Sequence, residues 1–295
     1  CSSGKFSLLW NHGTSGIVSF FKDYSMAKLR DKFWLWGQTA GSHHCLEGEN
    51  LYKLPGKNTM KPAEGAEFFG IKNCCRVVMG NNPLPPFDQY SQELKGMDQV
   101  VWSIVGDCGS KRNDDNGSDL DEVLCQAENF PNITGSVLDD FFKSDGIGRY
   151  ALQDITKIRN KLHSFSKRKL DLWMVWYDIH LDCDVQNYLD LCDVITFWTW
   201  KGCNLSMLDV NIPKVIEKTP DKRHLVGCYM WNYGESKPLT MDQMKFQLDR
   251  YYDWLYKGYI DGVIFCSNCI MDIGLETVEL TRNWIKEVGD AEVEM

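Results

Sequence analysis

Two adjacent carboxylates, Asp139 and Asp140, end a short apolar run that begins at Ile133. Paired carboxylates can give and take a proton and can attack or stabilise an electron-poor carbon atom, which is the chemistry that cleaves a glycosidic bond. Neighbouring residues of a strand point to opposite faces, so both side chains reach one site only if the strand ends between them. Val137 and Asp139 share a face, and Gly135 leaves room on it, so we expect Asp139 to point inward.

The apolar run at Ile133 is one of eight runs of strand length. They begin near residues 33, 74, 100, 133, 170, 193, 225 and 261, and a helical pattern separates each from the next. Parallel strands joined by helices need crossovers of this length, and eight of them close a barrel. We therefore predict an α/β fold, a single (β/α)8 TIM barrel over residues 33–290, after an N-terminal segment, residues 1–32, whose leading helix runs from Ile17 to Lys32. A doubly wound open sheet is the alternative, and it is weakened because no Gly-x-Gly-x-x-Gly motif follows the first strand.

The carboxyl ends of barrel strands, where active sites form, carry acids, amides and aromatic rings in this sequence. Asp107, Asp178 and Glu235 each follow a predicted strand and are candidate catalytic partners of Asp139 and Asp140. The candidate substrate-binding residues are Trp36, Gln38, Tyr177, Trp198, Trp200, Tyr229, Trp231, Asn232, Tyr233 and Asn268. Aromatic rings suit the flat apolar faces of sugars, so we expect an acidic pocket with aromatic walls and a carbohydrate substrate. Lys and Arg are nearly absent from these ends, which argues against a phosphorylated substrate.

The composition restricts the class of partner further. A chain of 295 residues with 43% hydrophobic residues can bury the core of one barrel. Its net charge of -9 opposes binding to a phosphate backbone, so we expect no nucleic-acid partner. No apolar run reaches the roughly 18 residues that a membrane-spanning helix needs, so we expect no transmembrane span.

The sequence begins Cys1-Ser2-Ser3-Gly4, which resembles the mature start of a bacterial lipoprotein, where a cleaved signal peptide leaves a lipid-modified cysteine. This resemblance implies a lipid anchor at Cys1 and an extracellular or cell-envelope location. The alternative is that residue 1 is only the point at which the sequence starts. The cysteines lack the paired CxxC spacing of a structural zinc site, so we expect buried thiols with one or two disulfides.

The segment from Gly135 to Phe141 resembles the fourth strand of chitinase-like barrel glycoside hydrolases, which ends in a run of alternating acids. The resemblance implies a TIM barrel that hydrolyses glycans. Asp139 matches the acid two residues before the final Glu of that group, and Phe141 stands where this Glu, the usual proton donor, would be. The mechanism of the group therefore does not transfer intact. We expect Asp139 and Asp140 to carry the chemistry with help from a carboxylate on another strand.

Other functions remain open at this point. The first is a metal-dependent hydrolase, whose ligands would be Asp107, Asp139, Asp178 and His180. The second is a barrel that binds carbohydrate without cleaving it. The adjacent acids could also serve only to bind Arg149 or cap the following loop. We expect no cofactor and no tightly held metal, because the strand ends lack a compact His-rich ligand set.

Overall fold

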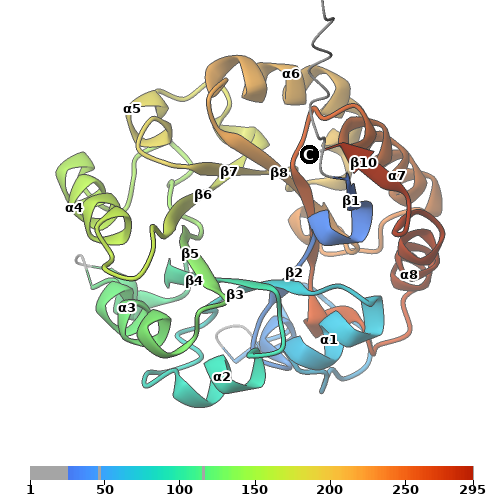
Figure 1. Cartoon of the computed structure of the whole chain (residues 1–295). Coiled ribbons are helices and arrows are strands. Elements are labelled where there is room, and N and C mark those ends of the chain that lie inside the picture. The colour runs from blue at the N-terminus through green and yellow to red at the C-terminus, as the bar shows by residue number, and fades with distance from the viewer. Residues whose placement is uncertain (1–25, 46–47, 115–116, 295) are drawn as a thin grey trace, which may run out of the picture.

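The computed structural model describes residues 26–45, 48–114 and 117–294 (Figure 1). Eight parallel strands in these ranges form a closed barrel in chain order, from β2 to β9. Their bounds are β2 Phe33–Gly37, β3 Asn73–Arg76, β4 Gln99–Val105, β5 Ile133–Leu138, β6 Asp171–Tyr177, β7 Val194–Trp198, β8 Arg223–Tyr229 and β9 Gly262–Cys266. The predicted single (β/α)8 TIM barrel is confirmed, and the open-sheet alternative is wrong.

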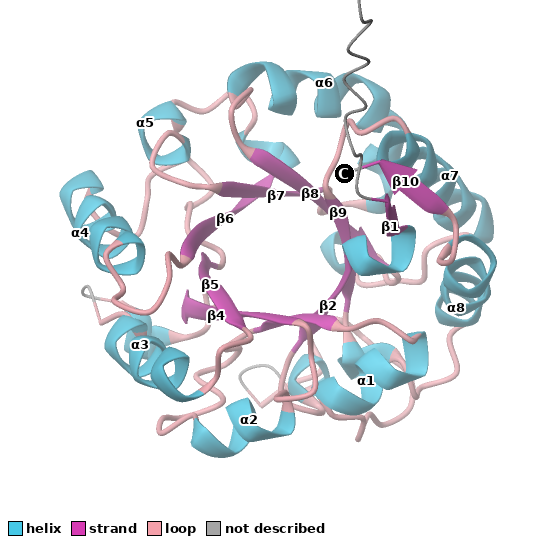
Figure 2. Cartoon of the chain, viewed as in Figure 1, coloured by secondary structure: helices cyan, strands magenta, loops and turns pink. Residues whose placement is uncertain are grey.

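A ring of helices covers the outside of the barrel (Figure 2). In α4 the apolar residues Ile155, Ile158 and Leu162 recur at helical spacing and are buried. Helix α7 begins with a capping box, in which Thr240 and Gln243 each bind a free backbone N–H group of the other. The bounds are α1 Pro62–Phe69, α2 Asp88–Glu93, α3 Leu120–Asn129, α4 Leu152–His163, α5 Gln186–Leu189, α6 Leu208–Lys218, α7 Met241–Tyr256 and α8 Glu276–Val288.

The first described residues pair with the end of the chain. Strand β1, Met26–Lys28, runs antiparallel to β10, Glu292–Glu294, and a 3-10 turn follows at Leu29–Lys32. Arg30 donates to the Asp290 carboxylate at 3.0 Å, across 260 positions of the chain. The predicted leading helix is therefore wrong over residues 26–28, and residues 29–32 form only a short 3-10 helix, because the partner that determines the conformation of this segment is remote in sequence.

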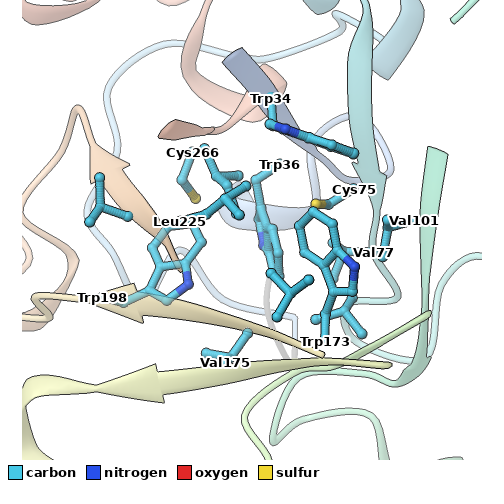
Figure 3. Packing of buried hydrophobic residues seen from close by; sticks show 14 of the residues in the cluster. Trp34, Trp36, Cys75, Val77, Val101, Trp173, Val175, Trp198, Leu225 and Cys266 are labelled. Atoms are coloured by element: carbon cyan, nitrogen blue, oxygen red, sulfur yellow. The ribbon is translucent and has the colours of Figure 1, made fainter. Parts of the chain in front are cut away.

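Four tryptophans fill the barrel interior (Figure 3). Trp34 packs edge-on against Trp173 with ring centroids 4.9 Å apart, and Trp36 packs in the same way against Trp198 at 5.1 Å. Gly227 of β8 makes the space for this packing, because a Cβ atom there would lie 1.9 Å from the Trp198 ring. The interior is therefore a packed core, and a ligand has access only where the strands end.

Gly135 has a different role from the one expected from the sequence. A Cβ atom at this position would lie 2.6 Å from the backbone oxygen of Asp171 on β6. The glycine therefore allows β5 and β6 to approach each other, rather than leaving room inside the barrel.

Three further expectations concern the cysteines, membrane spans and the start of the chain. The cysteines of the described residues are all free thiols, and six of them are buried. The predicted buried thiols are confirmed, whereas the predicted disulfides do not form within this part of the chain. None of the described helices is long and apolar enough to cross a membrane. Cys1 and residues 17–25 of the predicted leading helix lie outside the described residues.

Candidate active site

Both acids at the end of β5 face the mouth of the barrel. The strand ends at Leu138, so strand alternation does not apply to Asp139 and Asp140. The N–H group of Asp139 still donates to the Val105 carbonyl at 3.0 Å. Asp140 then adopts a left-handed conformation, with φ of 38°, and its N–H donates to Asp139 Oδ1 at 2.9 Å. This conformation costs about 1–2 kcal/mol, and it brings both carboxyl groups to one site.

A small cavity of about 50 Å³ lies at the mouth of the barrel, and we name it the mouth cavity. Three of the five predicted acids, Asp107, Asp139 and Asp140, line it. Six of the predicted substrate-binding residues also line it: Trp36, Gln38, Tyr177, Trp200, Tyr229 and Tyr233. The remaining lining residues are His43, Tyr52, Met79 and Cys266. The predicted acidic pocket with aromatic walls is therefore present in the structure.

A larger pocket of about 430 Å³ adjoins the mouth cavity, and we name it the outer pocket. The two spaces share Tyr52, Asp140, Tyr177 and Trp200. The rest of the outer pocket is formed by Cys108, Asp114, Phe142, Lys143, Ser144, Arg149, Ile179 and His180. Its volume falls in the range of small-ligand sites, whereas the mouth cavity is too small for a whole sugar unit. Asp140 thus lies at the boundary between a ligand-sized pocket and the buried acids.

The electrostatic environment of Asp139 favours its neutral form. Burial raises the pKa of this carboxyl group well above its ordinary range, and the nearby charges of Asp140 and Asp107 raise it further. The side chain is only 4% exposed. A carboxylic acid that keeps its proton near neutral pH can donate that proton to a leaving group.

Asp140 is held by two hydrogen bonds from neighbouring loops. Its Oδ1 accepts from the Tyr177 hydroxyl at 2.8 Å, and its Oδ2 accepts from the Cys108 N–H at 3.1 Å. Burial, followed by the charge of Asp140, raises the pKa of Tyr177 well above its ordinary value, so the phenol remains a donor. These bonds determine the orientation of the Asp140 carboxyl group at the edge of the outer pocket.

Asp107 lines the mouth cavity, but its oxygens are occupied by groups of the loops that follow β3 and β4. They accept from the N–H groups of Gly80 at 2.9 Å and Gly109 at 3.1 Å, and from the Ser110 hydroxyl. Burial raises the pKa of Asp107, and the Ser110 bond opposes this shift. Arg149 stabilises the loop after β4 by donating to the Gly106 carbonyl at 2.6 Å. These bonds hold Asp107 in place, and its charge helps to raise the pKa of Asp139.

The other two predicted acids bind loop groups and line neither the mouth cavity nor the outer pocket. Asp178 accepts from the Trp200 N–H at 3.2 Å and from the Asn204 amide at 2.8 Å, so it holds the turn that carries Trp200. Glu235 accepts from the Asn232 amide at 2.6 Å. Direct roles of Asp178 and Glu235 in catalysis stay predictions.

Two predicted aromatic binding residues lie away from the two spaces. Trp198 is 1% exposed and packs edge-on against Trp36 inside the barrel. Trp231 is also buried, and its indole N–H donates to the Tyr52 carbonyl at 3.0 Å. Both therefore support residues of the mouth cavity without lining it.

The predicted amides also stabilise the loops of the mouth. Asn232 accepts from the Gly202 N–H at 3.0 Å. Asn268 accepts from the Gln38 N–H at 2.8 Å and donates to the Gln38 carbonyl at 3.0 Å. Gln38 is held by its backbone, while its side-chain oxygen has no hydrogen-bond partner among the described residues. Because Gln38 lines the mouth cavity, its carboxamide is free to bind a polar ligand group.

His43 and Tyr52 also line the mouth cavity. The sequence places His43 or His44 in the loop after the first predicted strand, where an ordinary loop histidine is the expectation, and it does not mark Tyr52. His43 Nδ1 lies 2.8 Å from the Tyr233 hydroxyl, and burial lowers the pKa of His43 to about 3, so the ring is neutral. Tyr52 packs edge-on against Tyr233 with centroids 4.9 Å apart. Both come from the long loop after β2, where no periodicity predicts which side chains turn inward.

Phe141 lies in the hydrophobic core and not in the candidate active site. It is fully buried and packs against Phe142, Tyr150 and Tyr188. It lines neither the mouth cavity nor the outer pocket. The position that the sequence resemblance matches to the proton donor of the chitinase-like group therefore holds an apolar core residue.

A metal site is not supported by the donor set. Across residues 26–45, 48–114 and 117–294, no three His, Cys, Asp or Glu side chains are grouped so that they could hold a metal ion. Asp178 binds Trp200 and Asn204, whereas the His180 ring packs against Phe142 and Tyr177. The metal-dependent alternative thus lacks the ligand cluster that it requires.

Solved structures with a similar fold include glycoside hydrolases. One is active domain 2 of a chitinase from Pyrococcus furiosus, with 10% identity, a TM-score of 0.55, and coverage of 88% of this chain and 97% of that chain. A second is an endo-β-N-acetylglucosaminidase from Cordyceps militaris, with 11% identity, a TM-score of 0.52, and coverage of 88% and 89%. A third is a family GH18 chitinase from Cycas revoluta, with 9% identity, a TM-score of 0.52, and coverage of 85% and 99%. Neither a protein-family model nor a curated protein matches the sequence. At these identities the similarity shows the fold, and the predicted distant resemblance to TIM-barrel glycoside hydrolases is confirmed.

Proposed function

We propose that this chain is a glycoside hydrolase that cleaves an oligosaccharide or glycan, with Asp139 as the proton donor. The observation that carries the proposal is the buried Asp139 carboxyl group, whose pKa is raised, next to a second carboxyl group in a cavity walled by aromatic rings. Glycoside hydrolysis needs one carboxyl group that protonates the leaving oxygen and a partner that stabilises or attacks the anomeric carbon. Asp139 meets the first requirement, because its buried carboxyl group favours the protonated form.

Asp140 is the partner in this proposal. The bonds from Tyr177 and Cys108 orient its carboxyl group at the boundary between the mouth cavity and the outer pocket. From there it can attack the anomeric carbon, activate water, or orient an amide nucleophile on the sugar. Trp200 and Tyr177 line both spaces and offer rings against which a sugar can pack.

A barrel that binds carbohydrate without cleaving it is the second candidate. One observation favours it: the apolar Phe141 is fully buried where the chitinase-like group carries its proton donor. The aromatic walls and the acids would serve binding alone in that case. The two candidates differ in turnover, so an activity assay separates them.

The test is a hydrolysis assay on a panel of glucose, N-acetylglucosamine, galactose, mannose, xylose and fucose glycosides. The proposal expects turnover on at least one member, and a loss on the order of 100-fold or more in Asp139→Asn, because the amide cannot supply the proton. Asp253→Asn is the control, since Asp253 forms an exposed ion pair with Lys257 and lines neither space. Saccharide binding without turnover would favour the non-catalytic candidate.

The remaining expectations are separate proposals. A lipid anchor at Cys1, with an extracellular or envelope location, is tested by mass spectrometry of the protein from its native host. The absence of a nucleic-acid partner stays a prediction.

A further inference from the structure

One histidine in the wall of the outer pocket is buried without satisfying its ring nitrogens. His180 follows β6 and is 2% exposed. Neither Nδ1 nor Nε2 has a hydrogen-bond partner among the described residues; the Lys143 backbone faces the ring without reaching hydrogen-bond geometry. A buried polar atom without a partner destabilises the folded state. Such a group is therefore expected where a ligand completes the bond.

The ring of His180 is positioned by apolar contacts. Phe142 meets it at a centroid distance of 5.8 Å and Tyr177 at 6.1 Å, both edge-on. All three side chains line the outer pocket, which also contains Ile179, an apolar side chain that is 51% exposed. Both ring nitrogens are buried, so binding through them requires a local rearrangement of the pocket wall, which Lys143 and Ser144 also line.

The charge state of the ring indicates which ligand groups it suits. Burial lowers the pKa of His180, against opposing contributions from the Lys143 backbone and the charges of Asp140, Asp178 and Asp145. A neutral imidazole offers one donor and one acceptor. A sugar hydroxyl also donates and accepts, whereas a carboxylate or phosphate only accepts. The ring is thus matched to hydroxyl groups. The charged side chains that line the outer pocket, Asp114, Asp140, Lys143 and Arg149, balance in charge, so the lining does not select an anionic ligand.

We propose that the outer pocket is a subsite for a neutral sugar unit and that His180 recognises its hydroxyl groups. The sugar lies against Trp200, Ile179 and Phe142 and projects its hydroxyls toward the imidazole. The proposal rests on the proposed function, because it assigns the unit of the substrate that lies beyond Asp140.

The test measures binding separately from hydrolysis. Calorimetric titrations use the Asp139→Asn protein with neutral di- and trisaccharides of glucose, N-acetylglucosamine, galactose, mannose and xylose, and with glucuronic and galacturonic acid oligomers. We expect a neutral saccharide to bind, and His180→Leu to weaken it about 10-fold or more. His180→Gln, which keeps a donor and an acceptor, should lose less. In the Asp139→Asn protein the ring ¹⁵N signals of His180 should shift on titration.

A matched control separates recognition from structure. His224, at the start of β8, is also buried, but its Nε2 lies 2.8 Å from the Thr219 hydroxyl. His224→Leu should lower the Tm and leave binding unchanged, whereas His180→Leu should weaken binding without lowering the Tm.

The outcomes are distinct. Unchanged affinity in His180→Leu, tighter binding of the acidic oligomers, or no saccharide binding at all would overturn the inference. Binding that depends on His180 in a protein that hydrolyses nothing would support the inference and reject the proposed function. Hydrolysis that is unchanged in His180→Leu would support the proposed function and overturn the inference.

Discussion

The Tyr177 hydroxyl donates a 2.8 Å hydrogen bond to Asp140, a residue that lies 37 positions earlier in the chain and on the neighbouring strand end. The bond joins an aromatic wall residue, shared by the mouth cavity and the outer pocket, to one of the two central acids. Among the described residues only one other group, the Cys108 N–H, donates to the Asp140 side chain, so the phenol is a main determinant of its orientation.

Tyr177→Phe should therefore reduce turnover on the order of 10-fold while the protein stays folded, because the ring remains and only the hydrogen bond to Asp140 is lost. Tyr188→Phe is the control, since it removes a 3.0 Å bond from the Tyr188 phenol to the Tyr150 carbonyl behind the wall. Steady-state kinetics of both variants check this. Equal losses would show that Tyr177 does not act through Asp140.

The raised pKa of Asp139 predicts how activity and stability depend on pH. Turnover that needs the protonated acid should fall as pH rises through this raised pKa, and the fall should disappear in the residual activity of Asp139→Asn. The sign for stability is the same: a carboxyl group with a raised pKa in the folded state favours folding at low pH, and this contribution is lost as pH rises. Asp139→Asn should therefore melt no lower than the parent at pH 8. A lower Tm there would contradict the assignment.

At the opposite end of the barrel, an ion-pair cluster around Asp193 should stabilise the fold. Its carboxylate accepts from Lys169 Nζ at 2.7 Å, His163 Nε2 at 2.8 Å and the Leu172 N–H at 2.9 Å. Burial raises the pKa of Asp193, but these bonds lower it more, so the net shift is downward. A carboxyl group whose pKa is lowered in the folded state stabilises the fold at pH values above its unfolded pKa of about 3.9. This contribution is lost as pH falls through the folded pKa.

Asp193→Asn should accordingly lower the free energy of unfolding by about 1–3 kcal/mol at pH 7 and by less below about pH 3.5. Asp253→Asn is a control, because Asp253 forms only an exposed pair with Lys257 at 3.1 Å and should change stability by less than about 0.5 kcal/mol. Urea titrations at both pH values measure the difference. A loss that is equal at the two pH values would mean that the charge of Asp193 is not its source.

Gly227→Ala tests the packing beneath the mouth cavity. The new Cβ atom would overlap the Trp198 ring, so the variant should lose about 1–3 kcal/mol or more of stability and displace the tryptophan that supports Trp36. Gly96→Ala is the matched control, because no heavy atom lies within 4 Å of its added Cβ. Thermal unfolding and tryptophan fluorescence report both effects. An unperturbed Gly227→Ala protein would show that the barrel interior is looser than this packing implies.

Much of the fold was determined by local sequence patterns. Most of the strands are short apolar runs, and helices such as α4 carry apolar residues at helical spacing. Their alternation allows few topologies, so the barrel could be predicted without contacts. The same patterns placed Asp107, Asp139 and Asp140 at strand ends, and parallel strands of a barrel bring those ends together. The aromatic character of the pocket followed from the residue types at the other strand ends.

Only the tertiary structure decided how these residues are used. Both acids face the mouth because Asp140 leaves the strand in a left-handed turn, and its bonds to Tyr177 and Cys108 come from neighbouring strand ends. Asp178 resembled a catalytic partner in sequence, yet its oxygens bind Trp200 and Asn204. The physical reason is that burial and hydrogen bonding depend on groups far apart in the chain, whereas hydrophobic periodicity depends on neighbours. The sequence determines where acids stand along a strand, and long-range contacts decide which of them stay neutral, which are bound, and which are free to meet a ligand.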